Sequence, residues 1–419
     1  METENLVYNT DELEAPQWLN ADFLTKVLKE CEGDSAITIK NYKLTPATVR
    51  GDHYASVMFR AEVDYVQTGR SKTKSMIIKT MPEEDGSKKE LLQETHIFET
   101  EIGIYSEVIP RMEKILRAVG DNTVLGAKYL YYSLSPRKVI VFEDLVTVGY
   151  KVLRQRLPTM EEAKMTYLKL AKWHAVSYKL LQENPTYFDK YRYSIMTLTN
   201  FVESDFFIKG IDLFIELLSE VPTLRKYKSY FESIQQDLIQ DCKDIFTQYT
   251  DKKQSNTDYV LCHGDFHCKN MMFKHNPESG ELEDLMLLDY QVSYVGSLVN
   301  DIIYSYFLIL NPEMRLNHFD EMLYYYFKNF TETLTNIGYN GAVPKLEEIR
   351  SQIMKHKKFE LFLLTTMLPM WYVFFVGEID PDEMIESEDA RKNVYRNKDY
   401  IKELHNLLPR YMHLGYFEN

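Results

Sequence analysis

The segment VLCHGDFHCKNMMF contains the residues whose types and spacing are most informative about chemistry. His263, Asp265 and Asn270 follow one another as in the catalytic loop of a phosphotransferase. In such a loop the Asp accepts the proton of the substrate hydroxyl, and the Asn amide oxygen binds a magnesium ion. An apolar LMLL run then leads to the triplet that begins at Asp289, where a kinase has its second metal-binding Asp. These residues predict phosphoryl transfer assisted by Mg²⁺.

Three features on the N-terminal side of this segment occur in the order that phosphoryl transfer requires. Lys79 ends the apolar run SMIIK, from which its ammonium group could reach ATP phosphates, and Glu101 follows in a helical pattern and could hold that ammonium in place. The run VIVFEDL predicts a strand that leads into a hinge, where the backbone from Glu143 to Leu145 would hydrogen-bond adenine. The ordered set is much more specific than any single member.

The elements that must position these residues change in type along the chain. Residues 36–80 alternate between apolar and polar in three runs, which predicts an antiparallel meander. Helical spacing from Leu91 to Pro110 predicts one long helix, and KYLYYSLS and KVIVFEDL predict a second strand pair. From about Met160 onward the pattern is mainly helical, with two short strands and a turn predicted within residues 259–289.

Composition excludes several classes of protein. The 419 residues include 49 basic and 63 acidic side chains, and the net charge of −14 disfavours a broad contact with nucleic acid or anionic lipid. The four cysteines lack the pattern of a zinc ribbon, and the N-terminal residues lack the pattern of a secretory signal, so we predict a cytoplasmic protein. The apolar stretch from Leu361 to Val376 is shorter than the roughly 20 residues of a membrane span, and it is interpreted as a buried helix.

The chain resembles the ecdysteroid kinase-like family, also called CHK kinase-like, within the choline kinase and aminoglycoside phosphotransferase branch of the protein kinase-like fold. The motifs that carry this resemblance are GDHYAS, FETEIGIY, FEDL, KWHAVS, HGDFHCKN, LLDYQVS and VNDIIYS. The resemblance implies an α+β fold with two lobes. We expect an N-terminal helical extension in residues 1–35, a small antiparallel-sheet N-lobe in residues 36–143, and a larger, mainly helical C-lobe with the catalytic loop and the acceptor pocket in residues 144–419.

The resemblance also implies a role for each site residue and the cofactors ATP and Mg²⁺, with the nucleotide bound between the lobes. Asp265 would be the catalytic base, and Asn270 and Asp289 would bind magnesium. Lys79 would pair with Glu101 and with the nucleotide phosphates.

Two further residues would support the site in the family pattern, and two features depart from that pattern. Asp301 would brace the catalytic loop, and His263 would be structural, bonding backbone near the metal-binding turn.

The nucleotide-covering loop in residues 45–52 has one Gly, which gives its backbone amides less freedom to approach phosphate. Tyr290-Gln291 stands in place of Phe-Gly or the family's more usual Phe-Gln, a change that should be tolerated because only the preceding Asp contacts metal. The neighbouring pair Trp173-His174 is interpreted as core.

The sequence indicates less about the identity of the acceptor than about the reaction. Aromatic and methionine residues in the helical half would suit an apolar pocket wall, which favours an ecdysteroid or a hydroxylated xenobiotic of similar shape. A cationic acceptor, as in choline or aminoglycoside kinases, is the alternative. The expected partner is a small-molecule alcohol, with no nucleic acid, no membrane span and no obligate protein partner.

Two other classes of protein compete with the kinase interpretation. His263, Asp265 and His267 alternate with period two, so on a strand they would share one face and could ligate zinc or iron in a metal-dependent hydrolase. That hypothesis leaves Lys79 and Asp289 without a role. A non-catalytic binding protein with a kinase fold is the third hypothesis, although every residue that transfer requires is present.

Overall fold

The computed structural model describes residues 10–49, 56–83, 89, 95–154, 156–198, 202–250, 258–376 and 387–418. Contacts divide the chain into two compact units. We call Met1–Arg111, Val124–Lys151 and Met272–Gln291 the sheet unit, and Met112–Thr123, Val152–Met271 and Val292–Asn419 the helical unit. The domain boundaries expected after residues 35 and 143 stay predictions.

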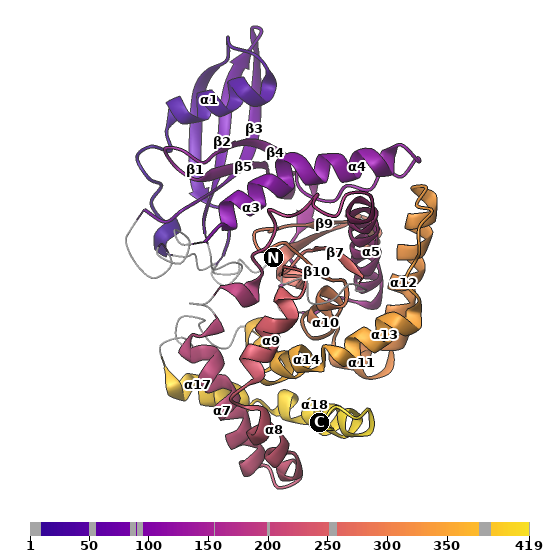
Figure 1. Ribbon diagram of the computed structural model, residues 1–419. Helices are drawn as coiled ribbons and strands as arrows, with labels where there is room; N and C mark the ends of the chain where they lie inside the picture. Colours follow the sequence, from indigo (N-terminus) through magenta and orange to yellow (C-terminus); the bar gives the residue numbers. More distant parts are fainter. Residues whose placement is uncertain are drawn as a thin grey trace. The chain divides into compact units, whose positions relative to one another are not determined.

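A five-stranded antiparallel sheet dominates the sheet unit, with the strand order β1-β2-β3-β5-β4 (Figure 1). Its strands are β1 (Thr38–Pro46), β2 (Val57–Gln67), β3 (Arg70–Thr80), β4 (Tyr129–Ser133) and β5 (Val139–Glu143). The predicted meander and the second strand pair are confirmed, because β2 pairs with both β1 and β3, and β4 pairs with β5. Lys79 lies opposite Met58 on one side and Ile140 on the other, so it occupies a central strand.

Helix α1 (Ala21–Glu32) covers one face of this sheet. The Asn20 side chain caps it by accepting hydrogen bonds from two backbone N–H groups of the first turn, and Gly33 ends it in the left-handed conformation. The shared core contains Leu24, Val27 and Leu28 from the helix and Phe59, Val63, Ile78 and Val141 from the sheet. The packing is therefore apolar on the face that α1 covers.

A continuous helix follows β3 and extends past Pro110. It consists of α3 (Ile97–Gly103), the π-helical turn η2 (Ile104–Val108) and α4 (Ile109–Arg117), whereas residues 91–94 of the predicted helix lie outside the described residues. The prediction that this helix ends at Pro110 is wrong. Proline lacks an N–H and clashes with the carbonyl four residues earlier in a regular helix, but here it follows a wider π turn.

The remaining elements of the sheet unit are short. They are η1 (Thr10–Glu12), η3 (Leu145–Val148), β6 (Tyr150–Lys151), β8 (Met271–His275) and β9 (Leu282–Leu287). Strands β6, β8 and β9 form a second sheet, and the turn between β8 and β9 contains the predicted Asn276–Gly280 segment. The two predicted strands are confirmed, and β7 (Tyr259–Cys262) is an additional strand before them, paired with β10 (Tyr294–Ser297).

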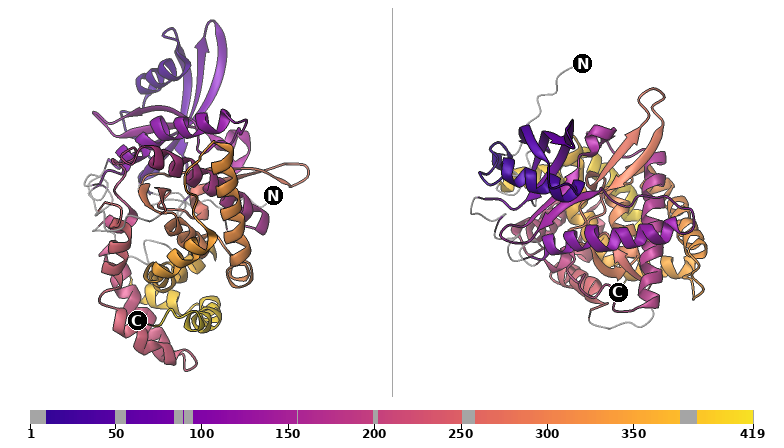
Figure 2. Two further views of the ribbon diagram at one scale, coloured as in Figure 1. Left: turned by 45° about the vertical axis from the view of Figure 1, so that its right-hand side comes forward. Right: turned by 90° about the horizontal axis from the view of Figure 1, so that it is seen from above.

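Helices make up most of the helical unit, as predicted. They are α5 (Met160–Glu183), α7 (Asp205–Glu220), α8 (Lys228–Ile234), α9 (Leu238–Thr247), α10 (Val299–Leu308), α11 (Pro312–Asn317), α12 (Phe319–Asn336), α13 (Leu346–Lys355), α14 (Lys357–Phe362), α15 (Leu368–Val376), α17 (Glu388–Tyr395) and α18 (Lys398–His413). Short turns are η4 (Ile195–Thr197), η5 (Arg225–Tyr227), η6 (Cys268–Asn270) and the π-helical η7 (Leu363–Met367). Helix α5 packs along α12 (Figures 1 and 2).

The apolar stretch from Leu361 to Val376 is helical. It comprises the end of α14, the turn η7 and α15, and the side chains of residues 361–366 are buried. Among the described residues, no helix combines the length and the apolar character that crossing a membrane requires.

Candidate active site

Lys79 forms the centre of a buried charged cluster in the sheet unit. Its Nζ lies 2.7 Å from Glu101 Oε2 and donates to Asp289 Oδ1 at 2.6 Å. Gln291 Oε1 is a third acceptor, at 3.4 Å. The structure therefore brings together Lys79, Glu101 and Asp289, the three residues that sequence analysis assigned to one nucleotide site.

Burial and charge determine the protonation of this cluster. Lys79 and Glu101 are 4% and 1% exposed. Burial lowers the pKa of Lys79, but the carboxylates of Asp289 and Glu101 outweigh it and raise the pKa above its ordinary value, so the ammonium form persists. The pKa of Glu101 is raised to about 7, because burial, together with the nearby charge of Asp289, outweighs the opposing ammonium of Lys79.

The backbone at Asp289 is unusual. Its φ of 62° lies in the left-handed region, which residues other than glycine seldom adopt. The next residue anchors the turn, since the Tyr290 hydroxyl donates to the carbonyl of Leu125 and its ring packs edge-on against Tyr105. Strained positions of this kind are common at functional sites.

The catalytic loop in the helical unit begins where β7 ends. Gly264 has a φ of 87°, and a Cβ at this position would lie 2.2 Å from the carbonyl oxygen of Val292. Only glycine satisfies both conditions, so the H-G-D sequence folds as a sharp turn. The Ser293 hydroxyl donates to the carbonyl of His263 and fixes the start of the loop.

Asp265 is held by three side chains of the same unit. Its Oδ1 accepts a hydrogen bond from the Tyr304 hydroxyl at 2.8 Å and lies 3.3 Å from His267 Nε2. Its Oδ2 accepts from Asn270 Nδ2 at 2.9 Å, and that nitrogen also donates to the Asp265 carbonyl. The backbone N–H of Lys269 donates to His267 Nδ1, which leaves Nε2 as the donor to Asp265.

These contacts keep the Asp265 carboxyl ionised. Burial raises its pKa, but His267 and the hydrogen bonds from His267 and Tyr304 hold the pKa well below the usual range. Burial, and then the charge of Asp265, raise the pKa of Tyr304, so its hydroxyl stays protonated and donates.

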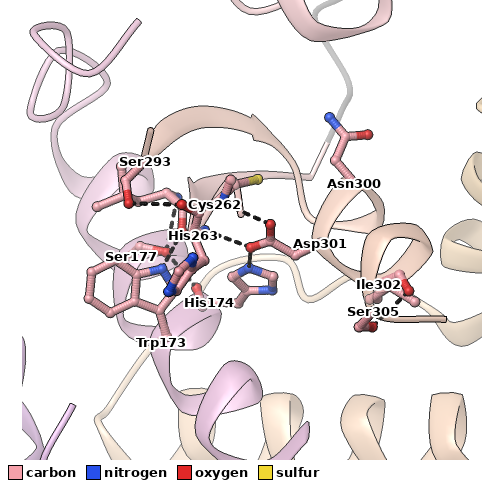
Figure 3. Close-up of polar contacts among 12 residues, drawn as sticks. Trp173, His174, Ser177, Cys262, His263, Ser293, Asn300, Asp301, Ile302 and Ser305 are labelled. Carbon is pink, nitrogen blue, oxygen red and sulfur yellow. Dashed lines mark hydrogen bonds and ion pairs between the residues drawn. The ribbon is translucent and has the colours of Figure 1, made fainter. Parts of the chain in front are cut away.

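Asp301 on α10 connects the loop to the core (Figure 3). Its Oδ2 accepts from the backbone N–H of His263 at 2.7 Å, and its Oδ1 accepts from that of Gly264 at 3.0 Å. His174 Nε2 lies 3.0 Å from Oδ2, and because a carboxylate only accepts, this nitrogen donates, while the Tyr326 hydroxyl contacts Nδ1. These are the contacts that a bracing role requires, and Trp173 and His174 are fully buried, as predicted.

The predicted hinge residues join β5 to η3 in the sheet unit. The Glu143 carboxylate accepts from the backbone N–H of Lys128 at 2.7 Å, and Asp144 accepts from Arg60 Nε and Ser75 Oγ, both at 2.7 Å. Leu145 begins η3, where helical geometry offers its N–H no backbone acceptor. Adenine recognition here stays a prediction that concerns backbone groups, because the acidic side chains have protein partners.

The family of this chain follows from comparison with known proteins. The ecdysteroid kinase-like family matches residues 50–339, more than half of the chain. The chain belongs to this family. Membership confirms the predicted class of enzyme, a phosphotransferase that acts on hydroxyl groups of small molecules. The α+β fold, with a small antiparallel sheet followed by a mainly helical part, also agrees with the kinase-like prediction.

The individual known proteins that were compared with this chain are at most distantly similar to it. No curated protein matches the chain significantly. Wild-type aminoglycoside 2′-phosphotransferase-IIIa in its GDP complex is 13% identical with a TM-score of 0.38, over 90% of this chain and 99% of that one. An ADP-bound aminoglycoside phosphotransferase is 12% identical with a TM-score of 0.35, over 90% and 98% of the two chains.

The local backbone does not support the hydrolase alternative. Strand β7 ends at Cys262, and the left-handed Gly264 interrupts the alternation that would place His263, Asp265 and His267 on one face. Among the described residues, the group with three possible ligand atoms within 4.8 Å of one another is a different one, His174, Cys262 and Asp301. Its histidine and carboxylate already form the bracing contacts described above.

Sequence analysis missed two residues of the site. One, Tyr304, contacts the Asp265 carboxylate, and the other, Gln291, contacts the Lys79 ammonium. Tyr304 lies three positions after Asp301 on α10, so helical spacing could have placed it on the same face of that helix. Gln291 was considered only as a tolerated replacement, although it lies within reach of Lys79. The predicted nucleotide-covering loop lies partly outside the described residues, as does most of the GDHYAS motif.

Gly264→Ala should destabilise the protein more than a glycine replacement at an open left-handed position. Gly338 is the matched control, since its φ is 72° and no atom lies within 4 Å of an added Cβ. Both variants incur left-handed strain of about 1–2 kcal/mol, and overpacking against Val292 adds about 1–3 kcal/mol to the first alone. Denaturant unfolding of both variants measures the difference, and equal losses would contradict the proposed close approach.

Proposed function

We propose that this chain is a cytoplasmic, ATP- and Mg²⁺-dependent kinase that phosphorylates a hydroxyl group of an apolar alcohol such as an ecdysteroid. The observation that carries the proposal is the buried Lys79 ammonium, held 2.7 Å from Glu101 and 2.6 Å from Asp289. A cation fixed in this way supports binding of the negatively charged phosphates of a nucleotide. The family's name supports the choice of an ecdysteroid or a similar steroid.

The residues assigned to magnesium have suitable chemistry for it. Asn270 Nδ2 donates to Asp265, so the amide Oδ1 is the atom left to serve as a metal ligand. The Asp289 side chain is 19% exposed, and its carboxylate is of the hard oxygen type that Mg²⁺ prefers. Bound Mg²⁺ would neutralise charge on the nucleotide phosphates.

Asp265 would act mainly by orienting the acceptor. A carboxylate whose pKa is held well below the usual range is a weak base, so it gains little from removing the hydroxyl proton early. Phosphoryl transfer has a loose transition state in which positioning supplies most of the catalysis. The fixed carboxylate would accept a hydrogen bond from the acceptor hydroxyl and take its proton late in the transfer.

A paired acceptor assay tests the choice of substrate. With ATP and Mg²⁺, we expect transfer of the γ-phosphoryl group to an ecdysteroid or a comparable steroid alcohol at least about tenfold faster than to choline or an aminoglycoside at equal concentration, because an apolar pocket leaves a buried cation unpaired. Chelation of Mg²⁺ should abolish transfer. Robust transfer to the cationic acceptors alone would replace the apolar acceptor with a cationic one, and the kinase assignment would stand.

A further inference from the structure

The two carboxylate oxygens of Asp265 have unequal sets of hydrogen-bond donors. Oδ1 lies 2.8 Å from the Tyr304 hydroxyl and 3.3 Å from His267 Nε2. Oδ2 lies 2.9 Å from Asn270 Nδ2, which is its single donor among the residues that the structure describes. Each oxygen of an ionised carboxylate has about two positions at which it accepts a hydrogen bond. The donors in this part of the chain therefore fill Oδ1 and leave one position on Oδ2.

Both donors to Oδ1 are themselves held in place. The Tyr304 ring is stacked with Phe359, at 6.4 Å between ring centroids. The His267 ring packs edge-on against Trp371 on α15, at 5.7 Å between centroids, and its Nδ1 accepts the backbone N–H of Lys269 at 3.2 Å. Donors that are fixed before the reaction need no rearrangement during it. The contacts at Oδ1 therefore belong to a preorganised part of the helical unit.

The exposed part of the site is consistent with this division of the carboxylate. Tyr304 is 4% exposed, whereas the Asp265 side chain is 15% exposed. An acceptor hydroxyl can thus reach the carboxylate without displacing the buried tyrosine. The position that is left on Oδ2 would accept a hydrogen bond from that hydroxyl.

We propose that Tyr304 and His267 are positioning residues that hold Oδ1, and that Oδ2 is the atom that receives the proton of the acceptor hydroxyl. This inference rests on the proposed function and adds to it the reacting oxygen and the residues that orient it. In the transfer, the acceptor oxygen forms a bond to the γ-phosphorus. The bond from that phosphorus to the oxygen it shares with the β-phosphate breaks, its electron pair stays on ADP, and the hydroxyl proton moves to Oδ2.

Tyr304→Phe tests the first contact at Oδ1. The ring remains, but the hydrogen bond to the carboxylate is lost. With ATP, Mg²⁺ and the acceptor that the wild-type protein phosphorylates fastest, we expect kcat to fall about tenfold and acceptor KM to stay within about twofold, because the lost contact orients the carboxylate and not the acceptor. Tyr306→Phe is the control, since its buried hydroxyl lies on the same helix and contacts the carbonyl of Arg315. A raised KM at unchanged kcat, or an equal fall in both variants, would overturn the positioning role.

Two substitutions separate the two contacts of the His267 ring. His267→Asn keeps an acceptor for the Lys269 N–H, but its amide nitrogen is too short to donate to Oδ1. His267→Gln has an amide nitrogen that reaches about as far as Nε2 and can donate, but it places no acceptor near that N–H. Denaturant unfolding should find the Gln variant less stable. We nevertheless expect kcat to be about tenfold below wild type in the Asn variant and within about threefold in the Gln variant. Equal values of kcat, or values that follow the stability order, would overturn the donor role of His267.

NMR of protein with ¹⁵N-labelled histidine tests the contact at Oδ1 without turnover. His267→Gln assigns the His267 signals by their loss. In the wild type we expect the proton on Nε2, and Asp265→Asn should move the resonance of that proton upfield, because its charged acceptor is gone. A proton on Nδ1 instead, or a resonance that does not respond to Asp265→Asn, would overturn the contact. The expected signals without phosphoryl transfer to any acceptor would reject the proposed function and leave the contacts at Oδ1 standing.

Discussion

Asp265→Asn is expected to lower the turnover number for phosphoryl transfer by about a hundredfold or more, because it removes the carboxylate that would orient the acceptor hydroxyl and take its proton late in the transfer. The variant should keep the loop geometry. Asn retains one side-chain oxygen that can accept from Asn270 Nδ2, and the Tyr304 hydroxyl can rotate to accept from the new amide nitrogen. His267 Nε2 loses its acceptor, but the ring keeps the hydrogen bond from the backbone N–H of Lys269. Nucleotide binding should therefore change by no more than a few-fold. Steady-state kinetics and nucleotide titration measure the two quantities.

The control for this variant is Asp258→Asn. Asp258 is a carboxylate of the same unit that accepts from Gln352 Nε2 and lies outside the catalytic loop. Its replacement should leave turnover unchanged. Full activity in Asp265→Asn would reject Asp265 as the catalytic base, whereas a parallel loss of nucleotide affinity and turnover would indicate that the loop had been disrupted.

Lys79→Met is expected to reduce kcat/KM for ATP by about a hundredfold or more, because it removes the cation that would meet the phosphates. The stability loss should be limited, since Glu101, whose pKa burial raises to about 7, can take up a proton once the ammonium is absent. Glu101→Gln should give a milder version of the same defect, because the ammonium keeps Asp289 as a partner. Both effects are measured with ATP as the varied substrate.

The double variant of Lys79→Met and Glu101→Gln decides whether the two side chains act as a pair. Residues in contact give non-additive effects, typically by about 0.5–3 kcal/mol. We therefore expect Glu101→Gln to cost little more once Lys79 is replaced. Additive losses would contradict the ion pair as a functional unit. Lys172→Met is the matched control, because Lys172 is ion-paired with Asp121 within the helical unit, is not part of the Lys79 cluster and should not affect the ATP dependence.

The sequence alone was sufficient for features that depend on neighbouring residues. The strands of residues 36–80 follow from period-two alternation, and the spacing of five positions between Asp265 and Asn270 placed both in one loop, where they contact each other. Chain geometry restricts such short-range arrangements to a few possibilities, so spacing and residue type are informative.

The expectation that a proline ends a helix failed at Pro110, because a π-helical turn precedes it. Proline normally ends a helix, but the π turn at Ile104–Val108 allows the helix to continue through Pro110 to Arg117. The rule assumes regular hydrogen bonds four residues apart. Nothing in the propensities of this segment separates a π turn from the α-helix on either side of it.

The tertiary structure decided which distant residues meet. Lys79 and Asp289 are 210 positions apart, and His174 and Asp301 are 127 apart. Sequence order could name Lys79 and Asp289 as candidates for one site, but the third acceptor, Gln291, and the brace from His174 depend on side-chain packing. The same holds for Tyr304, because only the folded chain brings its hydroxyl to Asp265 and stacks its ring with Phe359. The physical reason is that contacts between distant residues are selected by the packing of the whole core, which leaves no periodic signal in the sequence.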